Sequence, residues 1–225
     1  MTSADHVFVA SEINAASVVE ASQISDLTAI FEPEVQVCWL PREPLGAIAD
    51  YLDRASAPGR LRGTERQVIA AGTLPGFAGL PEAPGYADLR RDAAALIELF
   101  TTLLGCPGVG VRLEVLERAM CPRFHVDRVG IRLLCTYRGP GTEWLDERCA
   151  DRRWLGLAGH GKDDAESGLI RDPAGIERAP TFAVALLKGS AWQGNAGRGA
   201  IHRSPAVPIE AAPRVVLALD AIWDD

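Results

Sequence analysis

Hydrophobic residues in the first half of the chain recur mostly with the spacing of helices. The clearest case is 86–104, where the apolar positions fall on one stripe of a helix with 3.6 residues per turn. Asp88 suits the first turn of this helix, and Gly105 is a stop signal after its last turn. We therefore predict a mainly helical N-terminal part over 1–105. Weaker patterns predict helices at 15–22 and 45–55, a strand at 35–40 and a loop rich in glycine and proline at 72–86.

From residue 109 onward the hydrophobic period changes to 2, which is the period of a half-buried strand and is clear over Val109–Leu116. Antiparallel strands bury one face and protect their edges when they close as a jelly-roll or cupin-like barrel. The predicted fold class is therefore α+β, a single domain over 1–225 in which the helical part packs on a barrel core at 106–225. The later strand candidates lie at 123–129, 131–137, 181–188, 199–202 and 214–219.

One long stretch, 146–179, fits neither period and is rich in glycine, aspartate and arginine. Loops of this length inside a compact domain are more often functional than filler. We expect this segment to line the entrance of a site, as a lid would.

Composition limits the classes of function. The chain has 225 residues, 48% of them hydrophobic, which is enough for one core and short for two. Its formal net charge of −7 argues against a nucleic-acid or anionic-membrane partner, because both need a basic face. No apolar run approaches the roughly 18 residues of a membrane span, and no basic start precedes an apolar block. We expect a cytoplasmic protein that acts on a small-molecule or otherwise unidentified substrate.

The strongest chemical signal is a predicted metal site. His125 and Asp127 are two residues apart on a predicted strand, so both side chains would project from the same face. His202, which ends a short apolar segment far along the chain, is the best third ligand. Two imidazoles and one carboxylate leave coordination positions open, which suits Fe(II). Catalytic zinc also uses three protein ligands and a water, so the ligand types do not decide the metal.

Two alternatives stay open for these residues. They could be structural polar side chains with satisfied hydrogen bonds. Alternatively, Cys121, which shares the strand parity of His125, could be a fourth ligand that closes the site and makes it a structural or storage site for zinc. Arg132 has the opposite parity on a regular strand and would face outward unless the chain bends at Gly130.

The order H-x-D at 125–127, then His202, then Arg214 resembles the Fe(II)/2-oxoglutarate-dependent dioxygenase superfamily, whose fold is a double-stranded β-helix. The resemblance covers roughly 109–220. It implies that the two histidines and the aspartate bind iron and that Arg214 pairs with the distal carboxylate of 2-oxoglutarate, since a guanidinium fork matches a carboxylate. Arg203 is the fallback partner for that carboxylate. Tyr137 could also donate to the co-substrate, although a strand tyrosine more often serves packing.

Over nearly its whole length the chain is also similar to a bacterial family known only as a domain of unknown function. The similar stretches are Cys121–Asp127, Thr136–Trp144 and Leu187–Pro205. This resemblance implies no activity, but a link to metal homeostasis would favour zinc. We therefore predict an Fe(II)/2-oxoglutarate hydroxylase. The alternatives are a non-catalytic zinc-binding cupin-like protein in metal homeostasis and a barrel that has kept the fold and lost the chemistry.

Overall fold

The computed structural model describes residues 17–56, 61–63, 66–159, 161–208 and 212–223. Within these residues the centre of the molecule is a seven-stranded sheet in the order β1-β2-β8-β5-β10-β4-β3. Its β1–β2 pair is parallel and its other pairs are antiparallel. The strands are β1 (Val18–Glu20), β2 (Val37–Leu40), β3 (Gln67–Ala70), β4 (Gly108–Leu116), β5 (Ile131–Arg138), β8 (Val184–Lys188) and β10 (Arg214–Ile222).

A smaller antiparallel sheet has three strands in the order β7-β6-β9. It packs against the large sheet through a cluster centred on Trp144, which contacts residues of β2 and β8. The mixed structure with a large, mainly antiparallel sheet confirms the predicted α+β class. The bounds are β6 (Glu143–Leu145), β7 (Ile176–Arg178) and β9 (His202–Arg203).

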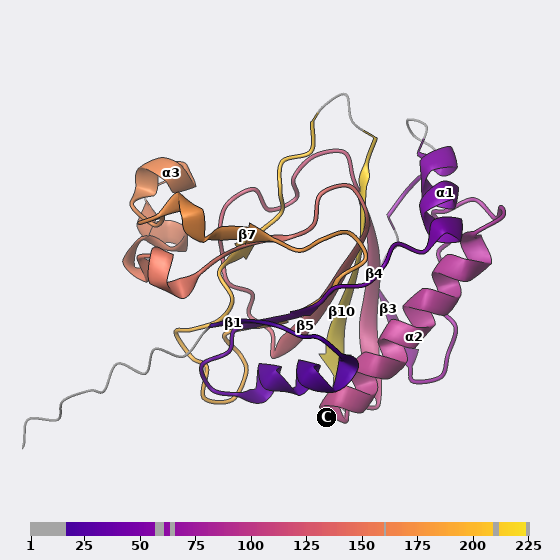
Figure 1. Cartoon of the computed structure of the whole chain (residues 1–225), viewed down its shortest axis with the longest axis horizontal. Helices are drawn as coiled ribbons and strands as arrows, with labels where there is room; N and C mark the ends of the chain where they lie inside the picture. Colours follow the sequence, from indigo (N-terminus) through magenta and orange to yellow (C-terminus); the bar gives the residue numbers. More distant parts are fainter. Residues whose placement is uncertain (1–16, 57–60, 64–65, 160, 209–211, 224–225) are drawn as a thin grey trace, which may run out of the picture.

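Two helices, α1 (Gly46–Ala55) and α2 (Tyr86–Leu104), cover one face of the large sheet (Figure 1). Both bounds agree with the sequence predictions. Gly105 ends α2 in the left-handed conformation, with φ 69°, and its backbone N–H donates to the Thr101 carbonyl at 2.8 Å. In the part of the chain that the structure describes, no helix combines the length and apolar character that a membrane span requires.

The three central strands β4, β5 and β10 separate a core face from a polar face because their side chains alternate. The core-facing side chains are apolar and lie under the helices, as Leu113, Leu133 and Leu217 do at 0% exposure. The other face carries charged residues, among them Arg112, Arg132 and Arg214. The predicted period of 2 is therefore confirmed, and it determines which residues can reach a site.

The N-terminal half is less helical than predicted. The helix expected at 15–22 is wrong for the described residues 17–22, because Val18–Glu20 forms β1 beside β2. β-Branched Val18 and Val19 suit this edge position better than a helix. The N-terminal part also supplies β2 and β3 to the large sheet, and a 3₁₀ helix, η1 (Ile24–Phe31), packs near them.

Two segments of the second half also differ from expectation. The strand predicted at 123–129 is wrong: its one regular contact is an isolated bridge between His125 and His202. The segment 146–179 is not a structureless loop, because it carries short elements that pack on Phe124 and Ile201. These elements are η2 (Glu147–Cys149), η3 (Arg152–Trp154), η4 (Gly156–Gly159), α3 (Asp164–Ser167), η5 (Pro173–Gly175) and β7.

Candidate metal centre

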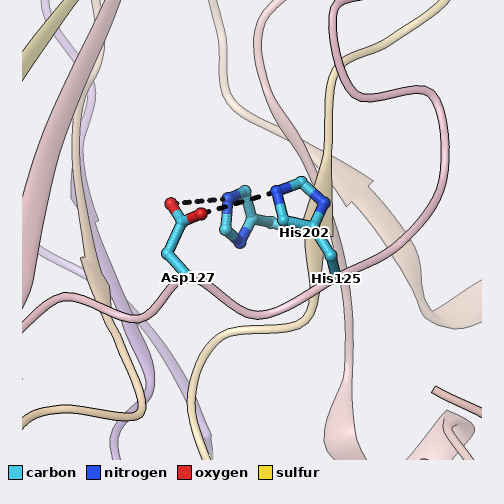
Figure 2. Close-up of side chains that lie close together, drawn as sticks. All are labelled: His125, Asp127 and His202. Carbon is cyan, nitrogen blue, oxygen red and sulfur yellow. Dashed lines mark ion pairs between the residues drawn. The ribbon is translucent and has the colours of Figure 1, made fainter. Parts of the chain in front are cut away.

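The structure brings His125, Asp127 and His202 together (Figure 2). The first two lie in the connection between β4 and β5, and His202 begins β9. The backbones of the two histidines pair directly, with the His125 N–H donating to the His202 carbonyl at 3.0 Å and the reverse bond at 2.9 Å. This antiparallel bridge, and not a regular strand, sets the two imidazoles side by side, with ring centroids 4.5 Å apart.

The three side chains present one ligand atom each to a common point. Nε2 of His125 lies 3.6 Å from Oδ1 of Asp127, and Nε2 of His202 lies 3.3 Å from Oδ2. All the ligand atoms are within 4.8 Å of one another. Ligands that each sit about 2.1 Å from one ion are about 3 to 3.5 Å apart, so this spacing is close to that of a bound state.

Hydrogen bonds fix the tautomer of both histidines. Nδ1 of His125 is 2.9 Å from the Arg123 carbonyl, and Nδ1 of His202 is 3.0 Å from the Ala200 carbonyl. A carbonyl oxygen accepts, so each Nδ1 donates its proton to that carbonyl, and each Nε2 is the nitrogen that faces Asp127 and would bind a metal ion once its own proton is lost. An N–H bond to a carbonyl behind the ring is the usual support for a metal-binding histidine. The donor set and its orientation therefore fit a metal ion.

The electrostatics keep the carboxylate charged. Burial alone would raise the pKa of Asp127, but hydrogen bonds from His125 and His202 and the charge of Arg132 outweigh it and hold the pKa well below its ordinary value. The hydrogen bond to Asp127 raises the pKa of His125 in turn. Metal and protons consequently compete for this imidazole.

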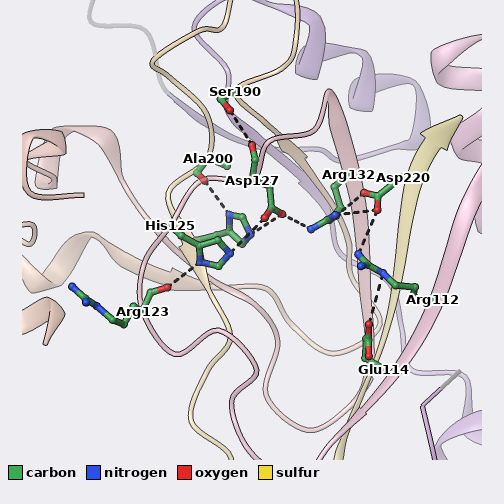
Figure 3. A network of polar contacts seen from close by, with 10 residues as sticks. Arg112, Glu114, Arg123, His125, Asp127, Arg132, Ser190, Ala200 and Asp220 are labelled. Atoms are coloured by element: carbon green, nitrogen blue, oxygen red, sulfur yellow. Dashed lines mark hydrogen bonds and ion pairs between the residues drawn. The ribbon is translucent and has the colours of Figure 1, made fainter. Parts of the chain in front are cut away.

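Arg132 holds the carboxylate from behind (Figure 3). Its Nη1 donates to Oδ2 of Asp127, while Nε and Nη2 bind the two oxygens of Asp220 at 2.7 and 3.0 Å. The outward orientation expected for a regular strand is therefore wrong. The chain before β5 is irregular through Gly130, so the parity counted from His125 does not carry over to Arg132.

A second supporting residue, Asp164, comes from the segment 146–179 and is 6% exposed. Its Oδ2 accepts from the backbone N–H of Phe124 at 2.8 Å and from Nη1 of Arg203 at 3.2 Å. Phe124 directly precedes His125, and Arg203 directly follows His202. One buried carboxylate thus fixes the chain beside both histidines.

Arg214 lies on the polar face of β10 and is 3% exposed. Its guanidinium donates only to neutral acceptors, and no carboxylate among the described residues forms an ion pair with it. Burial, with a smaller contribution from the charge of Arg178, lowers the pKa of Arg214 to about 10. A buried guanidinium without an anion is costly, so a partner other than the described residues is expected. The acceptors are the Pro140 carbonyl at 2.7 Å, Ser204 Oγ at 3.2 Å, Thr136 Oγ1 at 3.1 Å and Thr142 Oγ1 at 2.9 Å.

The other two predicted co-substrate residues already have partners. Arg203 pairs with Glu143 at 2.8 Å and with Asp164, and its guanidinium lies over the Phe124 ring. Tyr137 points to the opposite, helix-covered face of the sheet, where its hydroxyl donates to Asp92 at 2.7 Å. The geometry therefore favours Arg214 over both.

One pocket of about 350 Å³ is lined by His125, Asp127, His202 and Arg214. Cys121 lines this pocket and is exposed, but it does not belong to the group of metal-ligating atoms. No described residue of 146–179 lines the pocket, and the expected role of that segment at its entrance stays a prediction. The lining residues are Arg112, Glu114, Leu116, Met120, Cys121, His125, Asp127, Arg132, Leu134, Thr142, His202, Arg203, Ser204, Arg214, Val216 and Ala218.

The model of the family described as "Protein of unknown function (DUF1826)" matches residues 21–220. The chain belongs to this family. The match agrees with the resemblance seen in the sequence over nearly the whole chain. A search of curated proteins finds no match.

Distant likenesses to solved structures also exist. A dioxygenase for auxin oxidation from rice is 14% identical with a TM-score of 0.46, over 92% of this chain and 83% of that one. The Fe(II)/(alpha)ketoglutarate-dependent dioxygenase TqaL is 13% identical with a TM-score of 0.49, over 89% and 86%. A prolyl-4-hydroxylase from Pseudomonas putida is 11% identical with a TM-score of 0.45, over 90% and 100%. Because their identities are 11–14% and their TM-scores are below 0.5, these likenesses assign no reaction to this member of the family.

For two supporting residues of this DUF1826 chain, the sequence analysis left the direction of Arg132 open and missed Asp164. Arg132 was visible as a charged residue on a strand, but its direction depended on an irregular connection. Asp164 gave no signal, because its contacts are with residues 40 and 39 positions away. The segment contains other acidic residues in ion pairs, so only the three-dimensional neighbours of Asp164 set it apart from them.

Proposed function

We propose that this protein is a metal-dependent oxygenase that uses Fe(II) and 2-oxoglutarate and is built on a jelly-roll scaffold. The observation that carries the proposal is the buried Arg214, which has no acidic partner among the described residues and shares a pocket with His125, Asp127 and His202. A metal centre alone does not explain this guanidinium. A dicarboxylate that also reaches the metal explains both.

The metal would be held by Nε2 of His125, Nε2 of His202 and a carboxylate oxygen of Asp127. Arg132 occupies Oδ2 of that carboxylate and thus restrains its rotation. Three protein ligands leave positions for a co-substrate and for O2. When bound, Fe(II) and 2-oxoglutarate would supply the activation of O2 for hydroxylation of a substrate.

Arg214 would bind the distal carboxylate of 2-oxoglutarate. A guanidinium presents a planar fork that matches a carboxylate with two parallel hydrogen bonds. The hydroxyls of Ser204 and Thr142, which now accept from Arg214, can also donate to the same carboxylate. The apolar side chains of Val216 and Ala218 on β10 form the wall next to this path.

A second candidate function is zinc binding without catalysis, in metal homeostasis. The donor set of two histidines and one aspartate supports it equally, since zinc takes the same ligands. Cys121 in the same pocket could approach only after a rearrangement. This alternative leaves the buried charge of Arg214 without a role. A protein that has lost its chemistry would leave it unexplained too.

The test is an anaerobic titration of 2-oxoglutarate into the Fe(II) protein, followed by the weak visible charge-transfer band that a chelated keto acid gives. Arg214→Lys keeps the charge but loses the fork, so its affinity should fall by about 5- to 150-fold. Metal content should not change, because Arg214 is not a ligand. Arg203→Lys is the matched control in the same pocket. A loss in Arg203→Lys alone would move the anchor to Arg203, and no band in any protein would overturn the proposal.

A further inference from the structure

Arg112 is held more loosely than the other arginines of the pocket. Arg132, Arg203 and Arg214 each make hydrogen bonds of 2.8 Å or shorter. The contacts of Arg112 are longer: Nη2 lies 3.4 Å from Oδ2 of Asp220. Its Nε is buried and has no hydrogen-bond partner in the part of the chain that the structure describes. A buried donor without a partner is unfavourable, so the described residues do not fully satisfy the guanidinium of Arg112.

Glu114 lies next to Arg112 and is equally loosely held. The two residues are two apart on β4, so both side chains stand on the polar face (Figure 3). Oε1 of Glu114 is 3.7 Å from Nε of Arg112, which is too long for a hydrogen bond. Asp220, the other acid nearby, already binds Arg132 with both oxygens. The pocket therefore offers one guanidinium and one carboxylate that lack short partners.

The strand register puts this pair beside the path between the metal ligands and Arg214. Arg112 lies opposite Ala218 and Glu114 opposite Val216 in the β4–β10 ladder. Ala218 and Val216 face the same pocket, between Arg214 at one end of β10 and Asp220 near the other. A ligand on Arg112 and Glu114 would thus lie next to the proposed co-substrate.

The charges of the pocket indicate what such a ligand must carry. Fe(II), Asp127 and Arg214 together carry two positive charges, which 2-oxoglutarate would neutralise. Arg112 and Arg132 are balanced by Glu114 and Asp220. A further anion or cation would leave an uncompensated charge in a partly buried site, which is unfavourable. A ligand with one positive and one negative group keeps the balance and satisfies both loose residues.

We propose that the substrate is a small zwitterion of the α-amino acid class, with its carboxylate on Arg112 and its ammonium group on Glu114. This inference rests on the proposed function. Small-molecule pockets span about 300–1,000 Å³, so a pocket of about 350 Å³ has room for the co-substrate and only a small second molecule. Leu116 and the 52% exposed Met120 would contact the apolar part of the amino acid.

The experiment adds standard free amino acids, one at a time, to the anaerobic Fe(II)–2-oxoglutarate protein and follows shifts of the charge-transfer band together with calorimetric binding. Each amino acid is compared with the amine that lacks its carboxylate and with the acid that lacks its amino group. At least one zwitterion should bind, and each deletion should weaken it by at least about 10-fold, as for the loss of a charge-assisted hydrogen bond.

Variants test the two residues directly. Arg112→Gln and Glu114→Gln should each weaken the zwitterion by at least about 10-fold, while 2-oxoglutarate still binds. The matched controls are Arg198→Gln and Glu34→Gln, an ion pair of 2.8 Å that is absent from the pocket lining, and these should change nothing.

Three results would overturn the inference, and they distinguish its failure from that of the proposed function. A normal band that no amino acid shifts, or a shift that survives both pocket variants, would overturn the substrate class and leave the proposed function intact. Absence of the band before any amino acid is added would overturn the proposed function and this inference with it.

Discussion

The partly buried Arg42 and the buried Arg214 lie on opposite faces of the same sheet and have opposite surroundings. On the helix-covered face, Arg42 binds Asp92 with two parallel contacts of 2.8 and 3.0 Å, and Tyr137 donates to the same carboxylate. Burial would lower the pKa of Arg42, but Asp92 outweighs it and the pKa is raised. On the pocket face, Arg214 has no acid among the described residues, and burial lowers its pKa to about 10.

The polar network around Arg42 is complete within the described residues, whereas the one around Arg214 is not. Arg42, Asp92 and Tyr137 satisfy one another and tie α2 to the sheet, so they need no ligand. Arg214 and Arg112 keep unmet donors or unmet charge in the pocket that holds the metal-ligating residues. We infer that the polar face is completed by molecules that bind there, whereas the other face is complete by itself.

The largest expected effect is on metal binding. His125→Ala, Asp127→Ala and His202→Ala should each abolish stoichiometric binding of one ion, because three ligands are the minimum of the site. The loss should exceed the 10- to 100-fold change typical of supporting residues. Metal analysis after dialysis, with circular dichroism as the check of folding, measures it. Asp92→Ala is the control from the opposite face and should keep its metal. Full metal content in all three ligand variants would place the site elsewhere.

The free energy of unfolding should depend more on the Arg42–Asp92 pair than on Arg214. Asp92→Ala leaves Arg42 partly buried without an acid and should cost about 3 kcal/mol, the lower end for a broken buried pair because Arg42 retains some exposure. Arg214→Met removes a buried charge that has no counter-ion among the described residues and should cost less than about 1 kcal/mol. Urea unfolding of the metal-free proteins compares them. A larger loss in Arg214→Met than in Asp92→Ala would break the contrast drawn between the two faces.

The support from segment 146–179 should have a smaller effect. Asp164→Ala removes the acceptor that fixes the chain beside both histidines, so metal affinity should fall about 10- to 100-fold. Asp151→Ala is the matched control, since Asp151 is a buried acid of the same segment that pairs with Arg153 and Arg171 instead. Asp164→Asn keeps an acceptor for the Phe124 N–H and should recover part of the affinity. Equal losses in Asp151→Ala and Asp164→Ala would mean a general loss of packing.

The smallest expected effect is on the stability of the fold at acid pH. Burial would raise the pKa of Glu143, but Arg178 and Arg203 outweigh it and lower the pKa below the ordinary 4.5. A lowered folded-state pKa contributes stability above the ordinary value, and this contribution is lost as the pH falls through the folded-state value. Unfolding midpoints should therefore fall less steeply below about pH 4.5 in Glu143→Gln than in the unmodified protein. If the unfolding midpoints of the two proteins fall equally with pH, the ion pairs of Glu143 contribute no stability.

Periodicity was sufficient for the long elements of this fold. The stripe of α2 and the alternation in β4 each extend over nine residues or more, so packing and local preference agree. The short strand β1 was predicted as a helix because three residues give no period, and its strand form depends on pairing with the distant β2.

The three predicted metal ligands lie together in the structure, but the stated geometric reason for their proximity was wrong. Residue type and order pointed to His125, Asp127 and His202, whereas the predicted strand that should have aligned the first two does not exist. The bridge between the two histidines does that instead, and it joins positions 77 apart, which no local pattern reveals. Arg132 and Asp164 depend on similar long-range contacts.

The relative affinity of 2-oxoglutarate and glutarate tests the central claim most directly. Both carry the distal carboxylate for Arg214, but only 2-oxoglutarate has the keto acid that can reach the metal. Anaerobic calorimetry should find 2-oxoglutarate at least about 10-fold tighter in the Fe(II) protein, equal affinities in the metal-free protein, and a loss of both ligands in Arg214→Met. Equal affinities in the Fe(II) protein, or unchanged binding in Arg214→Met, would contradict the claim that the metal and Arg214 hold the two ends of one co-substrate.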